Sequence, residues 1–381
     1  MRIGVITFWQ SQDNYGQLLQ CFSLQRKLKD LGHSPYLIRY GFHERSYAQT
    51  KVEMLFAKFH LFRIYRDLKE SVQACCLKRS KDNRRFDLFR QMHIKQTCRF
   101  YNDVSELRNQ PPKADAYITG SDQVWAQLVS NKDNLSFFLD FGGKNIRRIA
   151  YAPSFAVNSY PPELNDELAK ALSRFDSISV REDTGRDICR KVGYDAVKVL
   201  DPTMLFDGAF YRKIKRSRKS HEDYAFVYHV NIASPEEIYW DDVLKYNKQQ
   251  GLALHAAYAN PVPNHDMEFL SGALYLYPTI SEWLGLIDEA KYVVTSSFHG
   301  MVFSVLFHKP FAICLRKKSM FAGNDRITSL LSELGLENQI YSGDNNLKDV
   351  LESPIDWAAV DEKLNKLRDH SVMFLSESLK V

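Results

Sequence analysis

A cluster of hydroxyl groups, a histidine and a glycine follows one of the most apolar runs of the chain. Ser296 and Ser297 come directly after residues 293–295, and His299 and Gly300 precede the apolar run 301–307. A strand that turns into a helix in this way leaves free N–H groups at the helix start, which favour phosphate or carboxylate. His299 there can transfer a proton or, when protonated, bind an anion. A capping serine beside a histidine that only shapes the turn is an equal alternative.

A second polar cluster follows the apolar run 117–119. Gly120 and Ser121 lead into Asp122, Gln123 and Trp125. A carboxylate, an amide and an indole are the groups that bind sugar hydroxyls and stack on the apolar face of a sugar. The alternative is a turn stabilised by Asp122, with Trp125 in the core, and for Trp125 this alternative is the stronger one.

Two further junctions carry polar groups. Arg181 follows residues 177–180 and can hold a carboxylate or phosphate through two parallel hydrogen bonds, unless it pairs with Glu182 or Asp183 instead. The loop 12–17, which includes Asn14, enters a helix after the first apolar run. It lacks Gly-x-Gly-x-x-Gly, which argues against a nicotinamide or flavin dinucleotide at this junction.

The elements that must position these clusters are short apolar runs alternating with helix-length amphipathic segments. The expected strands cover residues 3–8, 36–40, 116–119, 148–152, 177–180, 197–200, 224–230, 252–258, 292–295 and 310–315. This alternation predicts βαβ units and mainly parallel sheets, whose ligands bind beyond the carboxyl ends of the strands. A helix is expected over about 16–31, with Gly32 closing it.

A polar, strongly basic stretch at 211–221 separates two strand regions. We therefore predict an α/β fold with two Rossmann-like lobes that face each other across a cleft. The expected N-terminal lobe covers 1–206, a basic linker 207–222 and the C-terminal lobe 223–381, whose last helix packs back on the first lobe.

One insert interrupts the alternation, at about 45–100 in the N-terminal lobe. Residues 51–95 hold twelve Lys/Arg and five Asp/Glu, a net charge of +7, so the rest of the chain sums to −2. Apolar residues interleave with the basic ones at roughly helical spacing. The simpler interpretation, and the preferred one, is a helical insert packed on its lobe. The sharper one is a surface that rests on anionic lipid headgroups.

Composition excludes several classes of protein. The 381 residues are 45% hydrophobic and 25% charged, which is typical of a globular chain and not of a disordered or collagen-like one. A net charge of +5 does not predict nucleic-acid binding. The six cysteines are scattered without zinc spacing, which indicates reduced thiols and no metal site. With no apolar run of about 18 residues, we expect a soluble cytoplasmic protein.

Taken together, the junctions resemble the polysaccharide pyruvyl transferase family. The matching segments follow the family's order over about residues 3–340: DNYG (13–16), GSDQVW (120–125), YAPSF (151–155), SVRE (179–182), DPT (201–203), SFHG (297–300) and NDRI (324–327). Some members carry an arginine just before the Phe/Leu-His pair, where this chain has Ser297. A basic contact to the donor is therefore expected from Arg181, Arg316 or Arg326.

The resemblance implies a fold similar to GT-B glycosyltransferases. It also implies a reaction without a cofactor, in which the pyruvyl group of phosphoenolpyruvate is transferred onto two sugar hydroxyls as a cyclic ketal. It implies His299 as general acid or anion ligand, Arg181 as a grip on the donor and Asp122 as base. The donor would also meet Ser296, Ser297, Gly300, Arg316 and Arg326. The acceptor would meet Asn14, Tyr15, Gln17, Gln123 and Trp125 on the N-terminal lobe.

The family further implies bacterial capsule or exopolysaccharide synthesis, with galactose on a polyprenyl-diphosphate carrier as the first expectation for the acceptor. The basic insert would then bring the enzyme to the inner face of the plasma membrane. Two alternatives remain open: a GT-B glycosyltransferase that uses a nucleotide sugar, and a non-catalytic sugar-binding or assembly protein. Nucleic-acid binding is the weakest interpretation, because no recognised module accompanies the basic segment.

Overall fold

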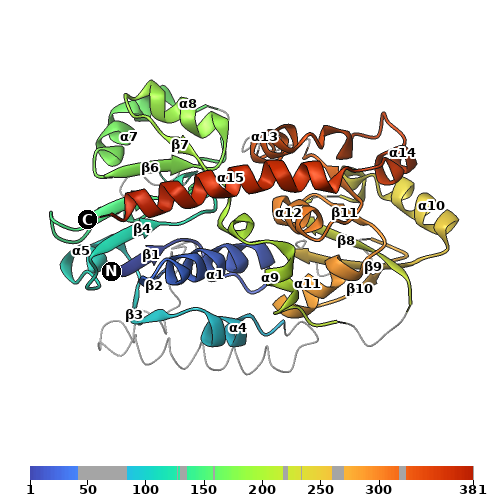
Figure 1. Ribbon diagram of the computed structural model, residues 1–381, viewed down its shortest axis with the longest axis horizontal. Coiled ribbons are helices and arrows are strands. Elements are labelled where there is room, and N and C mark those ends of the chain that lie inside the picture. Colours follow the sequence, from blue (N-terminus) through green and yellow to red (C-terminus); the bar gives the residue numbers. More distant parts are fainter. Residues whose placement is uncertain are drawn as a thin grey trace, which may run out of the picture.

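Two parallel β-sheets flanked by helices form the protein, as a computed structural model shows (Figure 1). The structure describes residues 1–41, 84–126, 128, 135–157, 159–217, 222–232, 234–259, 270–316 and 323–380. The predicted α/β class with two parallel sheets is confirmed. The first sheet has seven strands: β1 (Arg2–Ile6), β2 (Ser34–Tyr40), β3 (Gln96–Tyr101), β4 (Ala116–Thr119), β5 (Arg147–Ala150), β6 (Ser177–Val180) and β7 (Val197–Lys198).

The second sheet has six strands, and they repeat the order of the first. These are β8 (Tyr224–Val230), β9 (Ala253–Ala259), β10 (Leu274–Tyr275), β11 (Val293–Thr295), β12 (Phe311–Cys314) and β13 (Ile340–Tyr341). The orders are β3-β2-β1-β4-β5-β6-β7 and β10-β9-β8-β11-β12-β13. In each sheet the order reverses at one place, between β1 and β4 and between β8 and β11. Such a reversal opens a crevice at the carboxyl ends of the strands, where α/β proteins bind ligands.

Helices cover both sheets. In chain order they are α1 (Tyr15–Asp30), α4 (Phe86–His93), α5 (Val104–Asn109), α7 (Asn165–Leu172), α8 (Asp183–Lys191), α9 (Gly208–Arg212), α10 (Trp240–Gln250), α11 (Ile280–Glu289), α12 (Phe298–Leu306), α13 (Asp325–Leu334), α14 (Leu347–Glu352) and α15 (Trp357–Ser378). Gly32 follows α1 with a φ of 85°, the left-handed conformation that ends a helix. Among the described helices, none combines the length and apolarity needed to cross a bilayer.

The long helix α15 runs beside both sheets (red in Figure 1). Its Ser371 hydroxyl accepts a hydrogen bond from the backbone N–H of Leu200 at 2.9 Å, and its Arg368 donates to the carbonyl of Met204 at 2.8 Å. Both bonds hold the segment that follows β7. The final helix therefore fixes a loop of the N-terminal half.

The predicted helical insert at about 45–100 lies mainly outside the described residues, because these resume only at 84. The charge interpretation of 51–95 falls largely outside them as well. At the end of the expected insert, α4 is helical, but residues 96–101 form β3 at the edge of the first sheet. A helix over that stretch is therefore wrong. The segment QTCRFY has mostly half-buried and exposed residues and pairs in parallel with β2 instead.

Within the stretch 207–222, expected as a linker, the described residues 207–217 hold α9 and contact the C-terminal half. Asp288 of α11 accepts hydrogen bonds from Arg212 (2.8 Å) and Lys215 (2.5 Å), and Lys215 also bonds Glu289 at 3.1 Å. We call these four residues the linker cluster. Beside them Tyr211 is buried, so this segment is part of the core rather than a solvated connection.

Four cysteines lie in the described part of the chain and are free thiols. Cys21, Cys189 and Cys314 are buried and Cys98 is exposed, while Cys75 and Cys76 lie outside the described residues. Burial raises the pKa of the Cys21 thiol to about 12, so that it stays protonated at neutral pH.

Candidate active site

A polar cavity of about 430 Å³ lies between the two halves, where the strand orders of both sheets reverse. Residues from the N-terminal half and the C-terminal half line it together. The polar ones are Thr7, Gln10, Ser11, Asn14, Gln17, Asp122 and Gln123 from the first half, and Asn231, Ser297, His299, Arg316 and Arg326 from the second. Of the predicted site residues, eight therefore meet at one cavity.

The start of α12 forms the C-terminal wall. The Ser297 hydroxyl caps the helix by accepting a hydrogen bond from Gly300 N–H, and His299 follows on the first turn. A side chain at Gly300 would overlap Thr295, so only glycine fits there. Ser296 has a structural role instead. Its hydroxyl accepts from Val230 N–H at 3.0 Å inside the core, so the predicted contact of its side chain with the donor is wrong.

The start of α1 faces α12 across the cavity. Asn14 caps α1 by accepting from Gln17 N–H, and Gly16 packs directly against the imidazole of His299, where a methyl group would overlap the ring. Tyr15 does not reach the cavity, because its ring stacks on Trp283 and its hydroxyl bonds the Pro278 carbonyl. The predicted contact of Tyr15 with an acceptor is therefore wrong. Tyr15 joins the two halves instead.

The loop after β4 brings Asp122 and Gln123 to the cavity. Asp122 has a φ of 91°, a conformation that costs free energy for a residue with a side chain, and Asn231 after β8 has a φ of 53°. Backbone strain of this kind concentrates at functional sites. Trp125 is fully buried, stacked on Phe138 and hydrogen-bonded to the Phe137 carbonyl, so it cannot stack on a sugar. For Trp125 the core alternative holds.

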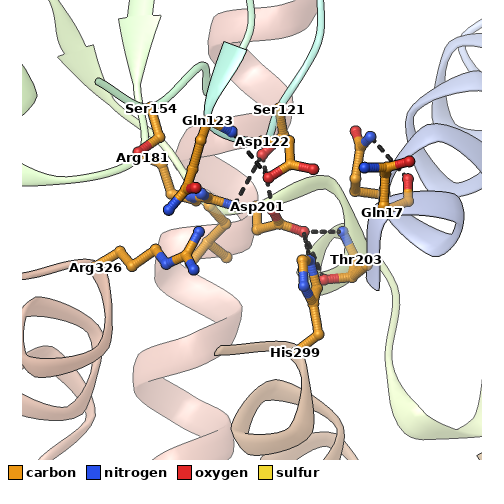
Figure 2. A network of polar contacts seen from close by, with 12 residues as sticks. Gln17, Ser121, Asp122, Gln123, Ser154, Arg181, Asp201, Thr203, His299 and Arg326 are labelled. Carbon is orange, nitrogen blue, oxygen red and sulfur yellow. Dashed lines mark hydrogen bonds and ion pairs between the residues drawn. The ribbon is translucent and has the colours of Figure 1, made fainter. Parts of the chain in front are cut away.

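Asp201, after β7, is the hub of a buried network that Figure 2 shows. Its Oδ2 accepts from Arg181 at 2.8 Å and from the Ser121 hydroxyl at 2.7 Å. Its Oδ1 accepts from Thr203 and lies 3.6 Å from Nε2 of His299. We call these five residues the cleft cluster. Burial alone raises the pKa of Asp201, but His299, Arg181 and Thr203 together lower it far below its usual range.

Arg181 lies behind this network and not on the polar cavity. Its side chain is 2% exposed and lines a neighbouring cavity of about 420 Å³, which shares Phe298 and Arg326 with the first. The guanidinium groups of Arg181 and Arg326 lie near the Phe298 ring, at 4.9 Å and 5.4 Å from its centre, respectively. Arg181 and His299 are therefore connected through Asp201, and the predicted contact of Arg181 with the donor stays a prediction.

Two other arginines do face the polar cavity. Arg326 donates from Nε to the Gly323 carbonyl at 3.1 Å, and its terminal nitrogens have no hydrogen-bond acceptor among the residues that the structure describes. Burial and the nearby positive charge of Arg181 lower the pKa of Arg326 to about 9. Burial also lowers the pKa of Arg316. Arg316 and Arg326 have no ion-pair partner among the described residues, so both guanidinium groups can bind an anionic ligand.

Comparison with known proteins gives the family. The model of the family described as polysaccharide pyruvyl transferase matches residues 14–317, about four fifths of the chain. The chain belongs to the polysaccharide pyruvyl transferase family. As a member it is an enzyme, and its family implies a pyruvyl donor and a polysaccharide acceptor. The matched range begins at Asn14, the cap of α1, and ends just after Arg316, so it contains the cleft cluster.

Solved structures similar to this pyruvyl transferase family member have low sequence identity. UDP-GlcNAc 2-epimerase from Neisseria meningitidis, bound to UDP-GlcNAc, has 9% identity and a TM-score of 0.49 over 100% of this chain and 99% of its own. UGT89C1 of Arabidopsis thaliana has 11% identity and a TM-score of 0.49 over 99% and 98%. UDP-GlcNAc 2-epimerase of Methanocaldococcus jannaschii has 12% identity and a TM-score of 0.44 over 97% and 94%. No curated protein matches the chain.

The motifs of the pyruvyl transferase family contain most of the predicted residues that line the cavity, but sequence reasoning missed the buried aspartate behind His299. DPT (201–203) is one of the matching segments, yet its aspartate had no expected role. The signal available was an aspartate directly after the expected strand 197–200, whose observed part, β7, pairs with the strand that precedes Arg181. Gln10 and Asn231 also line the cavity and were not expected.

Proposed function

We propose that this protein transfers the pyruvyl group of phosphoenolpyruvate onto two hydroxyls of a hexose, with galactose as the first choice. The product is a cyclic ketal, and phosphate is released. We place the reaction in capsule or exopolysaccharide synthesis, on a polyprenyl-diphosphate-linked acceptor at the inner face of the membrane. The single observation that carries the donor is the position of Arg316, Arg326 and His299 on one small cavity.

The donor fits the charges of that cavity. Phosphoenolpyruvate carries a carboxylate and a phosphate on the same carbon, C2, and Arg316 and Arg326 approach the cavity from two different elements, after β12 and in α13. A guanidinium binds either group through parallel hydrogen bonds. The free N–H groups at the starts of α1 and α12 add partial positive charge at the same place.

The reaction needs one proton donor and one proton acceptor. We assign the donor to His299, which protonates the methylene carbon of phosphoenolpyruvate and makes C2 electrophilic. An acceptor hydroxyl attacks C2 and gives its proton to Asp122. The bond from C2 to the phosphate oxygen then breaks, phosphate leaves, and the second hydroxyl closes the ketal. The two acceptor hydroxyls release two protons. One restores the proton that His299 gave to the methylene carbon, and the other leaves on phosphate.

The amide side chains around the same cavity suit a sugar. Gln10, Asn14, Gln17, Gln123 and Asn231 present amides to it. An amide both donates and accepts hydrogen bonds, as each sugar hydroxyl does. These side chains support a polyol acceptor held between the two halves, with its hydroxyl pair directed at the donor.

The test is a phosphate-release assay with phosphoenolpyruvate and lipid-linked oligosaccharides that differ in their terminal hexose. We expect phosphate release only when an acceptor is present. Mass spectrometry should show a product heavier by one phosphoenolpyruvate minus one phosphoric acid. Transfer of a whole sugar from a nucleotide sugar, with thermal stabilisation by UDP or GDP and none by phosphoenolpyruvate, would contradict the proposal and favour the glycosyltransferase alternative.

A further inference from the structure

Asp201 and Asp122 are carboxylates in different positions at the cleft. The Asp201 side chain is fully buried, whereas that of Asp122 is partly exposed and lines the polar cavity. Asp201 therefore does not face the polar cavity directly. An ionised carboxylate in such a place is strongly unfavourable unless positive charges and hydrogen bonds surround it.

Both carboxylate oxygens of Asp201 accept hydrogen bonds, and one of them also faces His299. Oδ2 takes the hydrogen bonds of Arg181 and Ser121, and Oδ1 takes those of the Thr203 backbone N–H and hydroxyl. The remaining direction of Oδ1 leads to Nε2 of His299 at 3.6 Å. Four hydrogen bonds thus fix the carboxylate, and a fixed carboxylate can in turn fix the imidazole.

The charged groups around His299 come from several elements. Asp201 follows β7, Arg181 follows β6 and lies on the far side of Asp201, and Arg326 approaches from α13. Asp122 follows β4 and lines the same cavity, as does Arg316 after β12, and Gly16 of α1 packs directly against the ring. Glu182 lies behind Arg181, 3.8 Å from its Nε. Of the described carboxylates, only that of Asp201 lies within 4.0 Å of an imidazole nitrogen of His299.

We propose that Asp201 is a positioning residue, which orients the imidazole of His299 and stabilises its protonated form, and that Arg181 acts through Asp201 instead of binding the donor. This inference rests on the proposed role of His299 as proton donor. Each transfer of the proton to the donor carbon leaves His299 neutral. The negative charge of Asp201 then favours reprotonation of the ring before the next turnover.

The main test is the pH dependence of kcat/KM in Asp201→Asn. Asparagine keeps the shape and one carbonyl acceptor but removes the negative charge. We expect kcat to fall about 100-fold and the alkaline limb of the profile, where His299 loses its proton, to move to lower pH. An unchanged alkaline limb would overturn the proposal.

Asp288→Asn is the matched control. Asp288 is also a buried carboxylate between two cations, but it belongs to the linker cluster away from the cavity. We expect this variant to lose thermal stability while keeping the wild-type pH profile. If both variants shift the alkaline limb equally, the shift reports general destabilisation and the proposal fails.

A second readout needs no activity and no variant of Asp201. In ¹⁵N-histidine spectra of the wild-type protein, assigned with His299→Gln, we expect neutral His299 to carry its proton on Nε2, the atom that faces Asp201. A proton on Nδ1 with a bare Nε2 would overturn the inference. This measurement remains valid if phosphoenolpyruvate is not the substrate, so failure of the proposed function and failure of this inference are distinguishable.

Arg181→Gln distinguishes between two roles of the arginine, action through Asp201 and direct binding of the donor. If Arg181 acts through Asp201, its loss lowers kcat and leaves the KM for phosphoenolpyruvate within about twofold of wild type. A rise in KM at unchanged kcat would show direct binding of the donor and contradict the proposal. Arg181→Lys, which keeps the charge, should recover part of kcat.

Discussion

The cleft cluster and the linker cluster each place a buried aspartate between cations. Only the linker cluster is closed, in the sense that its charged groups have partners within the cluster. In the linker cluster, both oxygens of Asp288 have cationic partners, and Lys215 has Glu289 as a second acceptor. In the cleft cluster, Nε and Nη2 of Arg181 and Nε2 of His299 are buried without a hydrogen-bond partner among the described residues. Folded proteins rarely leave buried donors unpaired.

This difference in hydrogen-bond pairing indicates different roles for the two clusters. A closed cluster stabilises the junction between the basic stretch and α11, and its geometry is complete without a ligand. An open cluster retains hydrogen-bonding capacity beside the cavity, at a cost in folding free energy. Residues of the open cluster should therefore change catalysis when replaced, and residues of the closed one should change stability.

The largest expected effect follows from His299→Ala. Removing the proposed proton donor should lower kcat by about 100- to 10,000-fold while thermal stability changes little. His308→Ala is the control, because His308 is an exposed histidine paired with Asp361. Steady-state phosphate release checks both variants. Near wild-type turnover in His299→Ala would remove the reason to treat the open cluster as catalytic.

Gly16→Ala should come next. The added methyl group would overlap the His299 ring and displace it from the cleft cluster, so kcat should fall about 100-fold. Gly143→Ala is the matched control, since a methyl group there meets nothing within 4 Å. Kinetics of the two variants, with circular dichroism to verify folding, tests whether the position of the ring matters. Equal activity in both would argue that it does not.

Arg326→Gln should affect donor binding more than turnover. Loss of a charged hydrogen-bond donor facing the cavity should raise the KM for phosphoenolpyruvate about 10- to 50-fold. Arg212→Gln, in the linker cluster, should leave that KM unchanged. Initial rates over a range of donor concentrations give both values, and an effect of the same size in Arg212→Gln would break the distinction between the clusters.

The smallest effect is expected from acidification of the linker cluster. Burial tends to raise the pKa of Asp288, but its bonds to Arg212 and Lys215 lower it below the usual value. The stabilisation is therefore complete above the unfolded-state pKa and is lost as pH falls through the lower folded-state pKa. Because Arg212 is 45% exposed, Asp288→Asn should cost only about 2 kcal/mol at neutral pH. Urea unfolding should show this difference shrinking below about pH 4, and a constant difference would contradict it.

The sequence predicted the sheets better than the centre of the site. Apolar runs before polar clusters located the strand ends, because buried parallel strands need continuous apolar residues and their loops carry function. The short edge strands β3, β10 and β13 were missed, since a strand of two residues or one with exposed positions has no apolar run to reveal it.

Side-chain direction was the other part that the sequence could not supply. Asn14, Gln17 and Asp122 turned toward the cavity, but Tyr15, Trp125 and Ser296 turned into the core. Neighbouring residues of a loop or a first helical turn point to different sides, and spacing alone does not say which side faces a ligand. The partnership of Arg181 with Asp201 was hidden for another reason, because twenty positions separate them along the chain.

The contact of α15 with the loop after β7 has a consequence for folding kinetics. The bond between Leu200 and Ser371 joins positions 171 apart. Contacts between such distant segments form slowly, because a long stretch of chain must be ordered before they can close. A refolding enzyme should therefore regain the circular dichroism of its sheets before it regains turnover, and that delay measures the docking of the last helix.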